Sequence, residues 1–168
     1  MNQRNIWYRW LFYGLAACLF LLLQNLAFWR IRVWGIHPFI PPVLVAVAAS
    51  WEDRQEGICA AAVFGLLCDL TMTPPIPCFY LLTFIASAFF AGLVAKRWIL
   101  PGFFCAFVVS LAAIVINGAF QTLLLSLRGI HDLGAAASIT GRELLLTAPL
   151  IPLVYLLFRR VHRRFPAD

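Results

Sequence analysis

The chain has 168 residues, of which 63% are hydrophobic and only 12% are charged. A water-soluble globule of this size needs more polar surface, so the composition excludes a soluble domain and predicts lipid as the main solvent. The net charge of +6 does not indicate nucleic-acid binding, because the basic residues stand at the ends of apolar runs and in a short tail. Basic residues placed in this way are typical of topology signals and lipid-headgroup contacts.

In chain order, the apolar runs predict an all-α fold: a polytopic transmembrane helical bundle of about six spans that forms one integral membrane domain over residues 1–168. The expected spans are residues 10–29, 36–51, 57–71, 78–95, 99–127 and 143–158.

Three features modify this pattern. The second run is short and begins with prolines, so it fits a short, tilted or re-entrant span. Charged residues 52–56 predict an excursion into water, and the glycine-containing stretch 128–142 predicts the longest loop.

The cysteines leave two minor alternatives. Residues 15–18 match a lipoprotein cleavage site, but the apolar run before Cys18 is too short for a signal core, so we expect an uncleaved span. The 5 cysteines show no CxxC spacing, which favours packing as small hydrophobes over disulfides or metal binding.

The basic residues also predict the orientation. With a cytoplasmic N-terminus, the inside would hold Arg4, Arg9, Arg54, Lys96, Arg97, Arg159, Arg160, Arg163 and Arg164. The outside would hold Arg30, Arg32, Arg128 and Arg142. The positive-inside rule therefore favours two cytoplasmic termini.

The third span carries a ridge of small residues that ends in a carboxylate. Gly57, Ala61, Gly65 and Asp69 follow at four-residue spacing, so they lie on one helix face and allow another helix to approach closely. Two interpretations stay open for Asp69: it caps or turns the chain before Pro74, or it makes a buried ion pair or hydrogen bond that locks two helices or a partner.

A polar stripe marks the fifth span. Ser110, Asn117, Gln121 and Arg128 fall within one narrow sector of a helix, and such a stripe should face other helices. It either packs against them or forms one polar seam with Asp69, with Arg128 as the counter-ion.

No catalytic arrangement is visible. The histidines lie in connections and in the tail, without a nucleophile and base arranged around them, and phosphate-loop and metalloprotease motifs are missing from the sequence. We therefore expect a protein that is not an enzyme and has no cofactor.

The segment from Glu56 to Leu70, which contains Gly-Leu-Leu-Cys-Asp-Leu, precedes a proline-rich turn and a span that ends at Lys96 and Arg97. With the proline-initiated second span before it, this arrangement resembles MreD, the rod-shape-determining membrane protein family of bacteria. The chain departs from that family after the turn, where members often have a glycine and this sequence has Pro77 and Cys78.

The resemblance implies a non-catalytic scaffold of the cell-wall elongation machinery. Such a scaffold binds MreC and helps to couple MreB filaments to RodA and a class B penicillin-binding protein. It also implies a fold like that of the substrate-binding subunits of energy-coupling-factor vitamin transporters. A subunit of such a transporter is the alternative function, and it would need an enclosed polar pocket beneath the outer loops.

Overall fold

The computed structural model describes residues 3–28, 35–52, 54–72, 76–97, 102–129 and 133–164, and the regular elements in these ranges are helical. They are α1 (Gln3–Leu23) with a π-helical turn (Gln24–Phe28), α2 (Pro41–Trp51), α3 (Arg54–Thr71), α4 (Phe79–Arg97), α5 (Phe103–Leu127), α6 (Leu133–Thr147), a 3-10 turn (Ala148–Leu150) and α7 (Ile151–Arg164). The all-α prediction is confirmed.

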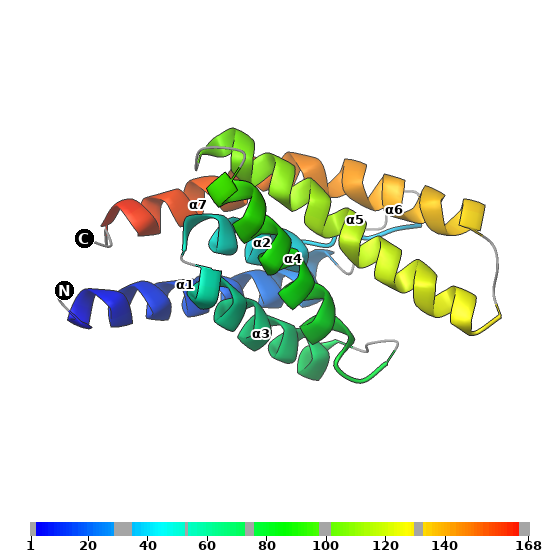
Figure 1. Cartoon of the computed structure of the whole chain (residues 1–168), viewed down its shortest axis with the longest axis horizontal. Coiled ribbons are helices and arrows are strands. Elements are labelled where there is room, and N and C mark those ends of the chain that lie inside the picture. Colours follow the sequence, from blue (N-terminus) through cyan, green and yellow to red (C-terminus); the bar gives the residue numbers. More distant parts are fainter. Residues whose placement is uncertain are drawn as a thin grey trace.

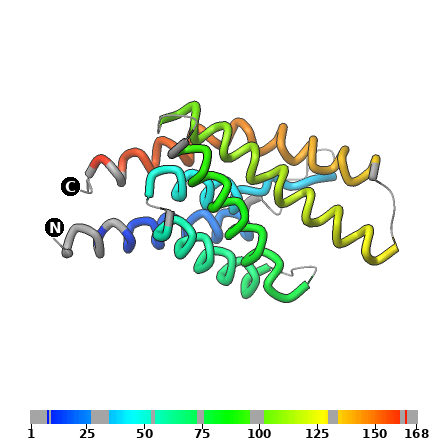
Figure 2. Tube along the Cα trace, viewed as in Figure 1, coloured from blue at the N-terminus to red at the C-terminus, as the bar shows by residue number. Residues whose placement is uncertain are grey.

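The helices form an elongated bundle in which the start of α1 and the end of α7 lie at the same end (Figure 1). At that end α2 turns into α3, and α4 is followed by α5. At the opposite end α3 turns into α4, and the far ends of α5 and α6 extend beyond the other helices (Figure 2). We call this opposite end the distal end of the bundle.

The second apolar run forms the short central helix α2. Its 11 residues rise only about 16 Å, whereas a membrane span needs about 20 residues. Residues 41–50 are all buried, and α2 packs against α1, α3, α4, α5 and α7. A pair of prolines occupies its first turn, where the missing amide hydrogens cost nothing. Helix α2 is therefore the core of the bundle.

One expectation about connections is wrong, and another stays a prediction. Glu52 is only 6% exposed and lies between α2 and α3, whereas Gln55 on α3 is exposed, so the excursion of residues 52–56 into water stays a prediction. The predicted loop 128–142 is largely helical, because α6 begins at Leu133 with a run of alanines, which favour helix strongly enough to accommodate Gly134 and Gly141. The last span is consequently longer than residues 143–158.

Length and composition identify two helical segments that could cross a membrane, Phe103–Leu127 and Gly134–Arg160. The second runs through α6, the 3-10 turn and α7. Shorter apolar helices cover Trp10–Leu26, Pro41–Trp51 and Phe79–Ala95.

Large apolar side chains cover much of the outer surface. On α1 the exposed residues recur every three or four positions: Leu11, Leu15, Leu19, Leu22 and Leu26. Similar exposed residues lie on α3, α4, α5 and α7, and an apolar surface of this extent is unusual for a soluble monomer. The membrane setting that the composition indicates agrees with this surface.

Candidate functional site

The ridge of small residues on α3 faces other helices of the bundle. A Cβ atom added to Gly65 would stand 2.6 Å from the Cα of Leu81, so α3 and α4 touch backbone to backbone. A Cβ atom on Gly57 would stand 3.1 Å from the Cα of Ala49 on α2, and Ala61 is fully buried. The ridge thus packs α3 against α2 and α4, and its role in binding a partner stays a prediction.

Asp69 joins α3 to α4 through hydrogen bonds. Its Oδ1 accepts from the backbone amide of Tyr80 at 3.0 Å, and its Oδ2 accepts from the amide of Leu81 at 3.1 Å. These amides belong to the first turn of α4, where backbone donors lack partners within the helix. The geometry has features of both interpretations: the partly buried carboxylate caps the first turn of α4 and thereby joins α3 to α4.

The residue before α4 has a backbone conformation that suits glycine. Cys78 has a φ of 61°, which places it in the left-handed region. Its side chain is exposed. Cys78 is one of the two residues, with Pro77, at which the sequence departs from the MreD family.

The polar stripe of α5 passes from the core to the surface. Ser110 and Asn117 are fully buried, Gln121 is half-buried, and Arg128 is exposed at the end of the helix. The hydroxyl of Ser110 donates to the carbonyl oxygen of Ala106 at 2.6 Å. Within the described ranges, neither the Oδ1 nor the Nδ2 of Asn117 has a hydrogen-bond partner.

Both carboxylate oxygens of Asp69 are directed to the first turn of α4, where they accept hydrogen bonds from backbone amides. The polar seam of this stripe with Asp69, with Arg128 as the counter-ion, stays a prediction. The spacing along α5 correctly places its residues on one face, but it carries no information on how far that face lies from α3. Arg30, Arg32 and His131 lie outside the described residues.

A segment in extended conformation enters α2 and is held by two polar side chains. The Nε2 of Gln24 donates to the carbonyl oxygen of Pro38 at 2.8 Å, and its Oε1 accepts from the amide of Ile40 at 3.2 Å. The amide of Phe39 donates to the Oγ1 of Thr147 at 3.2 Å. Gln24 therefore fixes this segment to α1, whereas Thr147 fixes it to α6.

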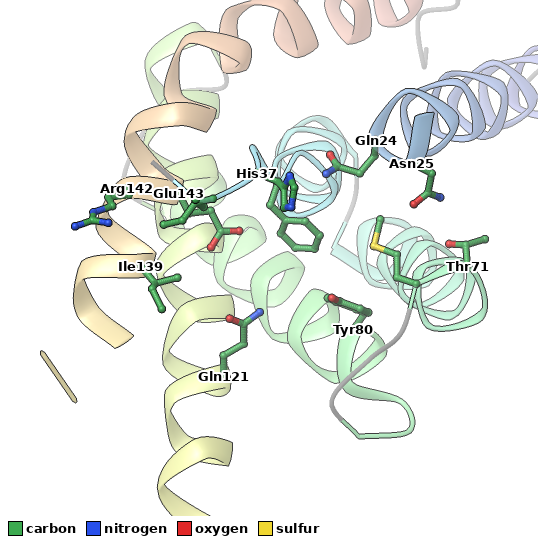
Figure 3. Close-up of a pocket in the computed structure, with 13 residues that line it drawn as sticks. Gln24, Asn25, His37, Thr71, Tyr80, Gln121, Ile139, Arg142 and Glu143 are labelled. Carbon is green, nitrogen blue, oxygen red and sulfur yellow. The ribbon is translucent and has the colours of Figure 1, made fainter. Parts of the chain in front are cut away.

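This segment forms one wall of a cavity of about 760 Å³ near the distal end of the bundle. A cavity of this size is in the range that holds a small organic ligand. Polar and aromatic side chains from several elements line it, among them Gln24, His37, Phe39, Tyr80, Gln121 and Glu143. Figure 3 shows the side chains of Tyr80, Gln121 and Glu143 directed toward a common space.

Glu143 is the acidic group of this cavity. It is only 7% exposed, and no hydrogen bond or ion pair joins it to another residue in the described part of the chain. The neighbouring Arg142 also contributes to the lining, but its side chain is exposed, and Figure 3 shows its guanidinium on the opposite side of α6 from the carboxylate of Glu143. The aromatic rings of Phe39 and Tyr80 lie with their centroids 5.7 Å apart.

Of these cavity residues, Gln121 was predicted as part of the polar stripe on the fifth span, whereas Gln24 and Glu143 were not predicted as site residues. Glu143 was placed at the start of a span, where a carboxylate reaches water easily, because the preceding residues were expected to form a loop. The helix that begins at Leu133 moves Glu143 into the interior of a continuous helical segment. A carboxylate followed by a long apolar run was the available signal.

The described residues contain no group of three or more His, Cys, Asp or Glu side chains that could hold a metal ion. Comparison of the chain with protein-family models, with curated proteins and with solved structures finds no match in any of the three.

Proposed function

We propose that the chain is a non-catalytic, multi-pass scaffold of the bacterial inner membrane, similar to MreD. It binds an MreC-like protein and contributes to the maintenance of rod shape. MreB, RodA and a class B penicillin-binding protein are the further partners of the machinery that this resemblance implies. Both termini are cytoplasmic in this proposal, so the cavity lies toward the outer face of the membrane.

The pairing of α3 with α4 carries the proposal. The residues behind the resemblance are those that bring the two helices into backbone contact at Gly65 and that fix the first turn of α4 through Asp69. A rigid helix pair of this kind can present a constant surface to a partner.

The outer face of α3 is the surface that we assign to the membrane helix of the MreC-like protein. It lies opposite the ridge and exposes an apolar row at helical spacing, Val63, Leu66 and Leu70. Helices associate in lipid mainly through close packing, so a partner helix would fit along this row.

Co-purification with an MreC-like protein after mild detergent extraction tests the proposal. Leu66→Trp on the outer face of α3 should lower the yield of the complex, whereas Leu153→Trp on the exposed face of α7 should leave it unchanged. Gly65→Leu and Asp69→Leu should also lower the yield while preserving insertion, because they displace α3 relative to α4. Repeated purification without an MreC-like protein would contradict the scaffold role.

The cavity supports a second candidate, the substrate-binding subunit of an energy-coupling-factor vitamin transporter. That function requires an enclosed polar pocket near the outer side, and the cavity of about 760 Å³ has a suitable volume and lining. Tight binding of a small vitamin to the purified protein, without any partner, would favour this candidate over the scaffold.

A further inference from the structure

Glu143 places an acidic group where water has little access. Removing a carboxylate from water is costly unless a positive group or several hydrogen bonds compensate it. Within the described ranges, Glu143 has no such compensation. The nearest basic side chain in sequence, Arg142, also lines the cavity, but it is exposed and its guanidinium lies on the opposite side of α6 from the carboxylate of Glu143 (Figure 3). The site is therefore complementary to a cation supplied from outside the chain.

The rest of the lining indicates what kind of cation. Phe39 and Tyr80 present aromatic rings to the cavity, and a cation over an aromatic face is attracted by the ring electrons. Gln121 adds an amide whose oxygen can accept a hydrogen bond. A carboxylate, aromatic rings and amide acceptors together suit an organic ammonium group, which carries charge, donates hydrogen bonds and has an apolar body.

The volume of the cavity excludes a bare metal ion as its only occupant. About 760 Å³ is far more than an ion requires, and carboxylate ligands other than Glu143 are missing from its described lining. An organic molecule fills this volume while its ammonium group meets Glu143.

We propose that this cavity binds an organic ammonium compound, with Glu143 as the counter-ion and with Phe39 and Tyr80 as aromatic contacts. The ammonium group comes either from a soluble amine or from the headgroup of phosphatidylethanolamine. The inference names the ligand class of the cavity and is independent of partner binding, because it is tested on the purified protein alone.

The soluble source is tested with two probes of similar shape and opposite charge. Tryptamine and indole-3-acetate are titrated into the detergent-solubilised protein, and binding is followed by calorimetry. Tryptamine should bind at least about tenfold more tightly than indole-3-acetate, a difference that corresponds to about 1.4 kcal/mol. Equal binding of the two probes would overturn the proposal for soluble amines, because the carboxylate would then not select charge.

The lipid source is tested by native mass spectrometry of the protein in mixed micelles. Phosphatidylethanolamine should stay bound at collision energies that remove phosphatidylglycerol of the same chain length. If this preference appears without tryptamine binding, the source is the lipid headgroup. If neither arm shows a preference for the amine, the site is not an ammonium site.

Substitutions assign the effect to Glu143. Glu143→Gln should lower amine affinity at least about tenfold, while Glu56→Gln, a carboxylate outside the cavity, should leave the affinity unchanged. Full amine binding by Glu143→Gln would overturn the proposal. The comparison of the two probes on the unmodified protein remains decisive if this variant does not fold.

Discussion

Asp69 on α3 accepts a hydrogen bond at 3.0 Å from the backbone amide of Tyr80, the second residue of α4. The carboxylate thus performs for α4 the capping function that a side chain at the helix start usually performs. Cys78 is the residue before α4, and its side chain has a thiol in place of the oxygen that a capping side chain supplies. The positive end of the helix dipole also favours a negative charge there.

Asp69→Leu should therefore reduce stability. Loss of a helix cap costs about 0.5–2 kcal/mol, and we expect the upper part of this range because two amides lose their acceptor. Asp69→Asn should cost less, since it retains one acceptor oxygen. Unfolding of the purified variants by sodium dodecyl sulfate in mixed micelles measures the difference. Equal stability of Asp69→Leu and the unmodified protein would show that the cap contributes nothing.

Gly65→Ala should also be destabilising, by about 1–3 kcal/mol, because the added methyl group would meet the backbone of Leu81 at 2.6 Å. Gly14→Ala is the matched control, since a Cβ atom at Gly14 has no atom within 4 Å. The control should change stability by less than about 0.5 kcal/mol. Thermal unfolding in the same detergent distinguishes the two, and similar effects of both variants would contradict the close contact.

Gln24→Leu should loosen the segment before α2. It removes both hydrogen bonds of the side chain and leaves the buried carbonyl of Pro38 and the amide of Ile40 without that partner. The expected loss is about 2 kcal/mol, since an unsatisfied buried polar group costs about 1–3 kcal/mol. Limited proteolysis should cleave near residue 38 faster in this variant than in Asn25→Leu, whose side chain is exposed.

Cys78→Gly should be stabilising by about 0.5–1 kcal/mol, because glycine adopts a φ of 61° without strain. Cys78→Ala should bring no gain, since alanine retains the Cβ atom. Melting temperatures of the three proteins provide the measurement. A lower melting temperature for the glycine variant would show that the thiol makes a compensating contact.

Chemical labelling of Cys78 would reveal the orientation of the protein in the membrane. Its exposed thiol lies in the connection between α3 and α4, at the end opposite to the termini. With cytoplasmic termini, a membrane-impermeant maleimide should label Cys78 in intact spheroplasts. Cys78→Ser should abolish this labelling, because Cys18 and Cys59 lie within helices that face lipid in the proposed bundle. Labelling that requires permeabilised membranes would reverse the assigned orientation.

The sequence predicted helices wherever apolar runs were long, and the predicted spans 57–71, 78–95 and 99–127 agree with α3, α4 and α5 within a few residues. The predicted span 10–29 overlaps α1, which begins earlier, at Gln3. It also placed Gly65 and Asp69 on the surface that meets another helix, since small residues at four-residue spacing form one ridge. Local sequence pattern does not determine which helix packs against this ridge, because the contact at Leu81 joins residues that are far apart on α3 and α4.

The beginning of α6 was missed because the glycines between Arg128 and Arg142 were given more weight than the alanines between them. Gly118 on α5 lies against the side chain of Thr140, since a Cβ atom added to Gly118 would stand 2.5 Å from the Oγ1 of that threonine. Tertiary packing therefore stabilises α6. The same error concealed the cavity, because Glu143 becomes an interior residue only when α6 is helical.

The burial of α2 has a consequence for biogenesis. Its prolines and 11 residues make it a poor independent insertion signal, and the helices that enclose it include α4, α5 and α7, which leave the ribosome later. During synthesis, α2 therefore reaches its final packing only after the C-terminal half of the chain has been made. Assembly of this protein in the membrane ends with the closing of late helices around an early one.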